Sequence, residues 1–184
     1  VVGHLEENPE MARALKVRLF LFAGESMYPD QRERISAAVP RSEVRSIGYA
    51  SNDAGFLGYA DSSCGPNEFR RHDGSTIYEI LDEETGEPIT EPGRPGRAVV
   101  TNLRRRLMPI LRYPVGDRAR WIDREGTPDR RFLLLGRSEE SARIASLSLY
   151  YEDLRRLLGR FRDRLGDPRF QMVTDREGCR DGLL

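Results

Sequence analysis

The chain has 184 residues, of which 38% are hydrophobic, a size and composition that fit one domain, or one domain and part of another. Its 30 basic residues balance its 30 acidic residues, so no net charge attracts nucleic acid, and we expect no nucleic-acid partner. No apolar run approaches the length of a membrane span, about 18 residues, and we expect no membrane partner.

The first part of the sequence indicates a parallel α/β arrangement. Residues 17–22, VRLFLF, predict a buried strand, and residues 30–38 predict an amphipathic helix that ends before Pro40. Residues 43–49, EVRSIGY, predict a second strand. A strand, a helix and a strand in this order are typical of a mostly parallel sheet. Residues 50–67, rich in Gly, Ser, Asn and Asp, predict a loop.

From residue 69 onward, the sequence contains short runs in which apolar and polar residues alternate. Runs within residues 75–89, 96–103, 118–123 and 131–136, separated by Gly and Pro turns, predict an antiparallel sheet or a small barrel. A strand or hairpin is expected at 142–150, a helix with one apolar face at 151–165 and a final strand at 169–175. We therefore expect three parts, residues 1–68, 69–136 and 137–184.

Polar residues gather in four short stretches that have an ordinary and a functional interpretation. FAGESM at 22–27 fits a strand-to-helix turn, and GRSEES at 136–141 fits either a linker or a hinge. Asn52 and Asp53, in GYASNDAG, fit an Asx turn, but they also offer an amide and a carboxylate to a phosphate and its Mg²⁺. Asp117 in RYPVGD either stabilises its own turn or binds a polyol at the edge of a pocket.

Taken together and in this order, the four stretches resemble the motifs of the acyl-adenylate-forming (AMP-binding) superfamily, most closely its phenylacetate-CoA ligase branch. Gly24 and Glu25 correspond to a Gly-Glu turn, and YASND at 49–53 corresponds to a Tyr-Gly-x-Ser/Thr-Glu motif. RYPVGD at 112–117 and GRSE at 136–139 correspond to the two motifs that follow. The intervening text at 79–103 is similar to the family's barrel segment.

The resemblance implies an enzyme that activates a carboxylic acid with ATP, releases pyrophosphate and then passes the acyl group to coenzyme A. It implies the end of a parallel α/β nucleotide-binding subdomain in residues 1–68. It further implies a small antiparallel β-barrel subdomain in 69–136 and the start of an α+β C-terminal lid in 137–184. The fold class is thus mixed α/β and α+β.

The resemblance also implies roles for individual residues. The catalytic residues would be Asn52 near the α-phosphate, Asp53 as the Mg²⁺ ligand and Glu139 as the hinge pivot. Asp117 would accept hydrogen bonds from the ribose hydroxyls, which suits a carboxylate with two acceptor oxygens. The remaining cofactor-binding residues would be Ala23, Gly24 and Glu25 around the adenine, Arg137 on the hinge side, and Tyr49, which would also wall the acyl pocket with residues 55–59.

Some family features do not match, and they leave alternatives open. The family's phosphate-binding loop lies upstream of these motifs and its lid lysine lies downstream, whereas the one lysine here is Lys16. We therefore expect a piece of a longer enzyme that is inactive by itself. Ala145 and Ser146 stand where the lid has small glycines, so the acceptor is either coenzyme A or a carrier protein. A non-catalytic nucleotide-binding or scaffolding module is the other alternative. The acid, for example an aryl acid, and the oligomeric state stay open.

Cysteine usage bears on metal binding and on the compartment. Cys64 and Cys179 form no disulfide framework, which favours a reducing, cytoplasmic environment. Cys64 and His72 are close in sequence, but a structural zinc ion requires four ligands. We therefore expect no zinc site, with Cys64 a free thiol and His72 a surface side chain.

Overall fold

The structure is a computed structural model that describes residues 2–24, 27–138, 141–144, 147–166, 170–171, 174–177 and 180–183. It contains two compact units, Val1–Leu135 and Gly136–Leu184. The predicted division of the chain at residues 68/69 and 136/137 stays a prediction.

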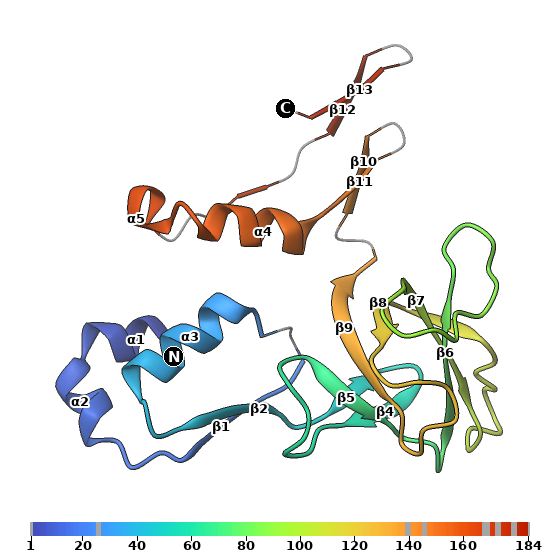
Figure 1. The fold of residues 1–184 in the computed structure, drawn as a ribbon, viewed down its shortest axis with the longest axis horizontal. Coiled ribbons are helices and arrows are strands. Elements are labelled where there is room, and N and C mark those ends of the chain that lie inside the picture. Colours follow the sequence, from blue (N-terminus) through green and yellow to red (C-terminus); the bar gives the residue numbers. More distant parts are fainter. Residues whose placement is uncertain are drawn as a thin grey trace. The chain divides into compact units, whose positions relative to one another are not determined.

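The first unit begins with a small α/β arrangement (Figure 1). Strands β1 (Leu19–Phe22) and β2 (Glu43–Ser46) pair in parallel and are connected through helix α3 (Pro29–Ala38), which confirms the predicted strand–helix–strand unit. Two short helices precede them, α1 (Val2–Glu7) and α2 (Pro9–Ala14), and neither was predicted. Each has six residues with little apolar periodicity, so packing rather than pattern defines them. Their buried side chains form a small core with α3 that contains Leu5, Ala12 and Val39.

The rest of the first unit is a seven-stranded antiparallel sheet in the order β3-β4-β5-β9-β8-β7-β6. In Figure 1 it contains the green and yellow strands together with the orange β9. Its strands are β3 (Tyr49–Ser51), β4 (Gly55–Tyr59), β5 (Glu68–Arg71), β6 (Thr76–Leu81), β7 (Pro95–Asn102), β8 (Tyr113–Trp121) and β9 (Arg131–Arg137).

Two details differ from the sequence prediction. The run at 43–49 is divided between two sheets because the chain turns at Gly48, where φ is +149°. The expected loop at 50–67 contains strand β4, whose residues Leu57 and Gly58 are buried. Glycine has low strand propensity, so the sequence of β4 looked like a loop, but burial against the sheet outweighs that preference.

The main core lies against this sheet and is rich in aromatic side chains. Tyr78 stacks on Phe132 with ring centroids 4.3 Å apart, and Trp121 meets Tyr78 edge to face at 5.8 Å. The indole N–H of Trp121 donates to the carbonyl of Ile89 at 2.8 Å, so its polar atom is satisfied inside the core. The Arg130 guanidinium lies 4.1 Å from the Trp121 ring centroid, within the range of a cation–π contact.

The second unit contains two hairpins and two helices. Strands β10 (Ser141–Ile144) and β11 (Leu147–Tyr150) form the predicted hairpin, and β12 (Thr174–Glu177) pairs with β13 (Arg180–Leu183). The predicted helix at 151–165 is two helices, α4 (Tyr151–Gly159) and α5 (Arg162–Leu165). Ala145, Ser146 and Cys179 lie outside the described residues. Among the helices of the described residues, none is long and apolar enough to cross a membrane.

Candidate functional site

Asp117 lies in the middle of strand β8, and not in a turn before a strand as its Pro-x-Gly context suggested. Between the pairs Pro114–Val99 and Arg118–Arg97, β8 has three residues where β7 has only Ala98. Gly116 has φ +83°, a conformation that glycine adopts without strain. Bulges of this kind redirect side chains and occur often beside active sites. The Gly-Asp pair therefore forms a bulge that sets the direction of the Asp117 side chain.

Tyr49 contacts Asp117 directly. The Tyr49 hydroxyl donates a hydrogen bond of 2.6 Å to Asp117 Oδ2. The Tyr49 ring is buried, with centroids 5.7 Å from Phe69 and 5.8 Å from Phe132. Tyr49 also borders a register shift, because Leu57 is an extra residue of β4 opposite the step from Tyr49 to Ala50. A fixed ring beside a bulge thus presents its hydroxyl to a half-buried carboxylate.

The negative charge of Asp117 affects the pKa of its buried neighbour Tyr78. The pKa of Tyr78 is raised well above its usual value, first because the side chain is fully buried and second because the charge of Asp117 is near. A buried phenol beside a carboxylate resists ionisation, since a second negative charge in a low-dielectric region is costly.

The turn between β3 and β4 carries Asn52 and Asp53, both exposed. The Ser51 hydroxyl, not an Asx side chain, accepts from the Ala54 N–H at 3.3 Å. The Asn102 amide donates to the carbonyl of Ala54 at 2.7 Å and joins the turn to β7. Asp53 Oδ2 accepts a 2.9 Å hydrogen bond from the Tyr113 hydroxyl, which raises the pKa of Tyr113. The carboxylate is thus held by β8 and does not cap its own turn.

Tyr113 was not among the predicted site residues, although the sequence contains a signal for it. YASND and YPVGD share the spacing Tyr-x-x-x-Asp, at 49–53 and 113–117. The structure pairs the two copies, since each tyrosine donates to the aspartate of the other copy. The hydrogen bonds therefore join Tyr49 to Asp117 and Tyr113 to Asp53, and they add Tyr113 to the predicted residues.

Ala23 and Gly24 follow the C-terminal end of β1, and both are exposed. The N–H of Ile47 donates to the carbonyl of Phe22 at 3.1 Å, so the chain leaves β1 and β2 at the same edge. Ala23 and Gly24 come directly after this edge, and Tyr49 begins β3 two residues past Ile47. Ligands of parallel α/β sheets bind at such edges.

Three further predicted residues are Arg137, Glu25 and Glu139. Arg137 is exposed at the end of β9 and belongs to the second unit. Glu25 and Glu139 lie outside the described residues. Their predicted roles stay predictions, as do those of Asn52, Ala23 and Gly24.

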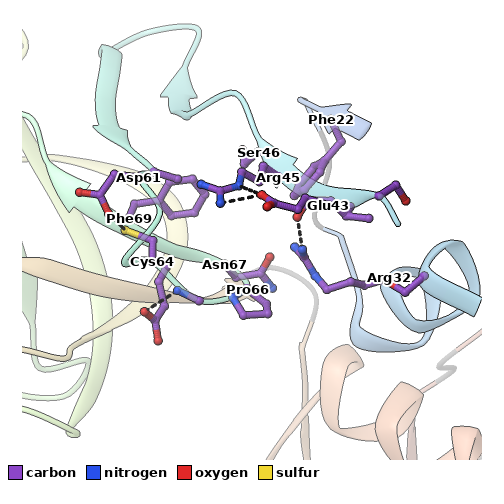
Figure 2. Close-up of a pocket in the computed structure, with 16 residues that line it drawn as sticks. Phe22, Arg32, Glu43, Arg45, Ser46, Asp61, Cys64, Pro66, Asn67 and Phe69 are labelled. Carbon is purple, nitrogen blue, oxygen red and sulfur yellow. Dashed lines mark hydrogen bonds and ion pairs between the residues drawn. The ribbon is translucent and has the colours of Figure 1, made fainter. Parts of the chain in front are cut away.

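A cavity of about 260 Å³ lies in the first unit, near α3, β2 and the segment between β4 and β5 (Figure 2). Its described lining includes Arg32, Arg45, Asp61, Cys64 and Glu68, but neither Asp53 nor Asp117. Its charged groups largely contact one another or nearby groups. Arg45 donates to Glu43 at 2.7 Å, and Asp61 accepts from Arg70 at 2.6 Å. The paired Tyr–Asp segments, rather than this cavity, are the candidate site.

Cys64 and His72 have separate partners. The Cys64 thiol lies 3.6 Å from Asp61 Oδ1, and His72 Nδ1 lies 2.8 Å from the Ser75 hydroxyl. Burial raises the pKa of the Cys64 thiol. In the part of the chain that the structure describes, no group of three or more His, Cys, Asp and Glu side chains could hold a metal ion. The expectation that Cys64 and His72 bind no zinc stays a prediction.

Comparison with known proteins supports the family resemblance. No protein-family model matches the chain. It is 32% identical over 109 residues to the phenylacetate-coenzyme A ligase of Thermus thermophilus, a match that covers 57% of this chain and 24% of the relative. Among solved structures, the chain is similar to 2-hydroxyisobutyryl-CoA ligase in the postadenylation state, in complex with R3-HIB-AMP. The TM-score is 0.71 and the sequence identity is 21%, and the match covers 99% of this chain and 40% of the ligase.

The fold is that of the adenylate-forming superfamily. A second structure of 2-hydroxyisobutyryl-CoA ligase, in complex with 2-HIB-AMP and CoA, also matches, with a TM-score of 0.55 and 22% identity over the whole chain. The resemblance drawn from the four motifs is confirmed. The chain spans about a quarter of the relative's length and 40% of the length of the solved ligase.

Proposed function

We propose that the chain is part of an ATP-dependent carboxylate-activating enzyme that forms an acyl-adenylate and then a thioester with coenzyme A. The observation that carries the proposal is the pairing of the two Tyr-x-x-x-Asp segments within an adenylate-forming fold. It joins the segment that carries Asp117, which the motifs assign to the ribose, to the segment that carries Asp53, which the motifs assign to the metal. In this proposal residues 1–68 end the nucleotide-binding α/β subdomain, residues 69–136 form the barrel subdomain and residues 137–184 begin the mobile lid.

The donor chemistry of the paired segments suits a nucleotide. Asp117 would accept from the two ribose hydroxyls, since an ionised carboxylate has two acceptor oxygens with about four lone-pair sites. Asp53 would supply one carboxylate to Mg²⁺, which commonly takes one or two carboxylates together with phosphate oxygens. When bound, the metal would neutralise charge on the phosphates, and Asn52 on the same turn would donate to the α-phosphate.

Exchange of pyrophosphate into ATP by the complete enzyme, with a panel of alkyl and aryl carboxylic acids, tests the proposal. We expect acid-dependent exchange from the complete enzyme and none from the 184 residues alone. Asp117→Asn should raise the KM for ATP about tenfold to a few hundredfold, because hydrogen bonds to a charged group contribute about 1.5–3 kcal/mol each. Asparagine retains an acceptor for Tyr49, so the melting temperature should change little. Neutralisation of Asp82, on the β6–β7 turn, is the matched control.

The alternatives make different predictions in the same assays. ATP binding without exchange for any acid would favour a non-catalytic nucleotide-binding or scaffolding module, and an absence of nucleotide binding would overturn the proposal. If exchange occurs, coenzyme A and a phosphopantetheine-bearing carrier protein can be compared as acceptors of the acyl group. Thioester formation on the carrier alone would replace coenzyme A in the proposal.

A further inference from the structure

The two Tyr–Asp hydrogen bonds form a crossed pair. Each segment begins with a tyrosine and ends four residues later with an aspartate, and the hydrogen bonds run from Tyr49 to Asp117 and from Tyr113 to Asp53. The partners are 68 and 60 residues apart in sequence. Each aspartate thus accepts a hydrogen bond from the tyrosine of the opposite segment.

Each segment also contains a feature that fixes the direction of its aspartate. Asp117 stands in the β8 bulge beside Gly116, and Asp53 stands in a turn that Asn102 joins to β7. The tyrosine rings differ in burial, because Tyr49 is 7% exposed within the aromatic core whereas Tyr113 is half-buried. The Tyr49 ring is therefore the more closely packed of the two.

We propose that Tyr49 and Tyr113 are positioning residues of the nucleotide site, with Tyr49 aiming Asp117 at the ribose and Tyr113 aiming Asp53 at the metal. This inference rests on the proposed function and deepens it. A hydroxyl that donates to one carboxylate oxygen fixes the rotation of the carboxylate plane, so the remaining lone pairs point in a defined direction. Loss of the hydroxyl removes this restraint on the orientation of the carboxylate.

Nucleotides that differ in one group separate positioning from a structural role. In the complete enzyme, Tyr49→Phe should weaken AMP binding about tenfold and should not change binding of 2′,3′-dideoxy-AMP, which lacks the diol. Tyr113→Phe should leave metal-free AMP affinity unchanged and should raise about tenfold the Mg²⁺ concentration that half-saturates ATP binding. Thr85→Ala removes a hydroxyl that donates to Asp82 in the β6–β7 turn, and it is the matched control.

Each outcome decides for or against the inference. Equal losses for AMP and dideoxy-AMP in Tyr49→Phe, or an unchanged Mg²⁺ requirement in Tyr113→Phe, would overturn it while the proposed function stands. Wild-type enzyme that binds neither nucleotide would overturn the proposed function and this inference together. In the 184-residue chain, Tyr49→Phe and Asp117→Ala should shift the melting temperature non-additively, as should Tyr113→Phe and Asp53→Ala. Strict additivity in both pairs would show that the hydrogen bonds do not couple these residues.

Discussion

Aspartates of the first unit have two kinds of hydrogen-bond donor. Asp61, Asp82 and Asp123 accept from backbone N–H groups, hydroxyls or arginines, and their pKa values are lowered. Asp53 and Asp117 accept from tyrosine hydroxyls. The first kind stabilises turns and strand ends, whereas the second kind holds the carboxylates of the candidate site.

Asp82 gives the clearest pH dependence of stability. The N–H groups of Thr85 and Glu84 donate to it and hold its pKa at about 2. The unfolded value is about 3.9, so its contribution to stability is fully present above that pH and is lost as the pH falls toward 2. Asp82→Asn should lower the melting temperature at pH 7 and reduce the change in melting temperature between pH 5 and pH 2. Glu84→Gln in the same turn is the control, and identical pH profiles for wild type and Asp82→Asn would contradict the assignment.

Cys64 should behave as a slow, metal-free thiol. Burial raises its pKa, so the thiolate fraction at pH 8 is smaller than in a model peptide and alkylation should be correspondingly slower. Metal analysis of the purified protein should give far less than one zinc per chain. Stoichiometric zinc, together with alkylation of Cys64 that requires a chelator, would show that Cys64 and His72 belong to a metal site.

At the scale of elements, the pairing of β6 with β7 depends on one close approach. A Cβ built on Gly96 would lie 2.3 Å from the backbone oxygen of Leu81 and 2.7 Å from Ile89 Cδ1. Neither neighbour is the end of a flexible polar side chain, so the strands themselves would have to move apart. Only glycine at this position allows the observed strand spacing.

Gly96→Ala should therefore destabilise the first unit by about 1–3 kcal/mol, the usual cost of overpacking. Urea denaturation followed by tryptophan fluorescence measures this directly, because Trp121 lies in the same core. Gly3→Ala is the matched control, since no atom lies within 4 Å of the added Cβ and alanine favours helix α1. Equal stability of the two variants would mean that β7 shifts without loss of packing.

At the scale of the whole molecule, stability is concentrated in the first unit. Every residue of the main aromatic core belongs to Val1–Leu135. Among the side chains described in Gly136–Leu184, none is buried. In helix α4, Leu154 and Leu158 are half-buried and Leu157 is 49% exposed.

Hydrogen exchange should reflect this difference. Amides of β6, β7 and β8 should exchange only through global unfolding, whereas amides of α4 should exchange at least tenfold faster through local opening. Mass spectrometry of peptic fragments measures both regions in one experiment. Comparable protection of α4 and β7 would show that the second unit is stabilised as strongly as the first.

The sequence by itself determined the local elements and the family. Its periodicities predicted the parallel β1–α3–β2 unit and the alternating strands, because these depend on neighbours a few residues apart. The order of its four motifs indicated the adenylate-forming superfamily. Strand β4 was not predicted, because its glycines favour a loop when the partner strand is unknown.

Only the tertiary structure decided how the site residues meet. It placed Asp117 in a bulge rather than in a turn, because a bulge is defined by the register of β8 on β7 and not by β8 alone. It also revealed Tyr113, whose hydroxyl reaches a carboxylate 60 residues away. The repeated Tyr-x-x-x-Asp spacing is visible in the sequence. Its functional significance depends on the hydrogen bonds between the two segments, which form only in the folded chain. Local propensity cannot predict such a contact, because it depends on side-chain hydrogen bonds between β8 and residues of β3 and its turn.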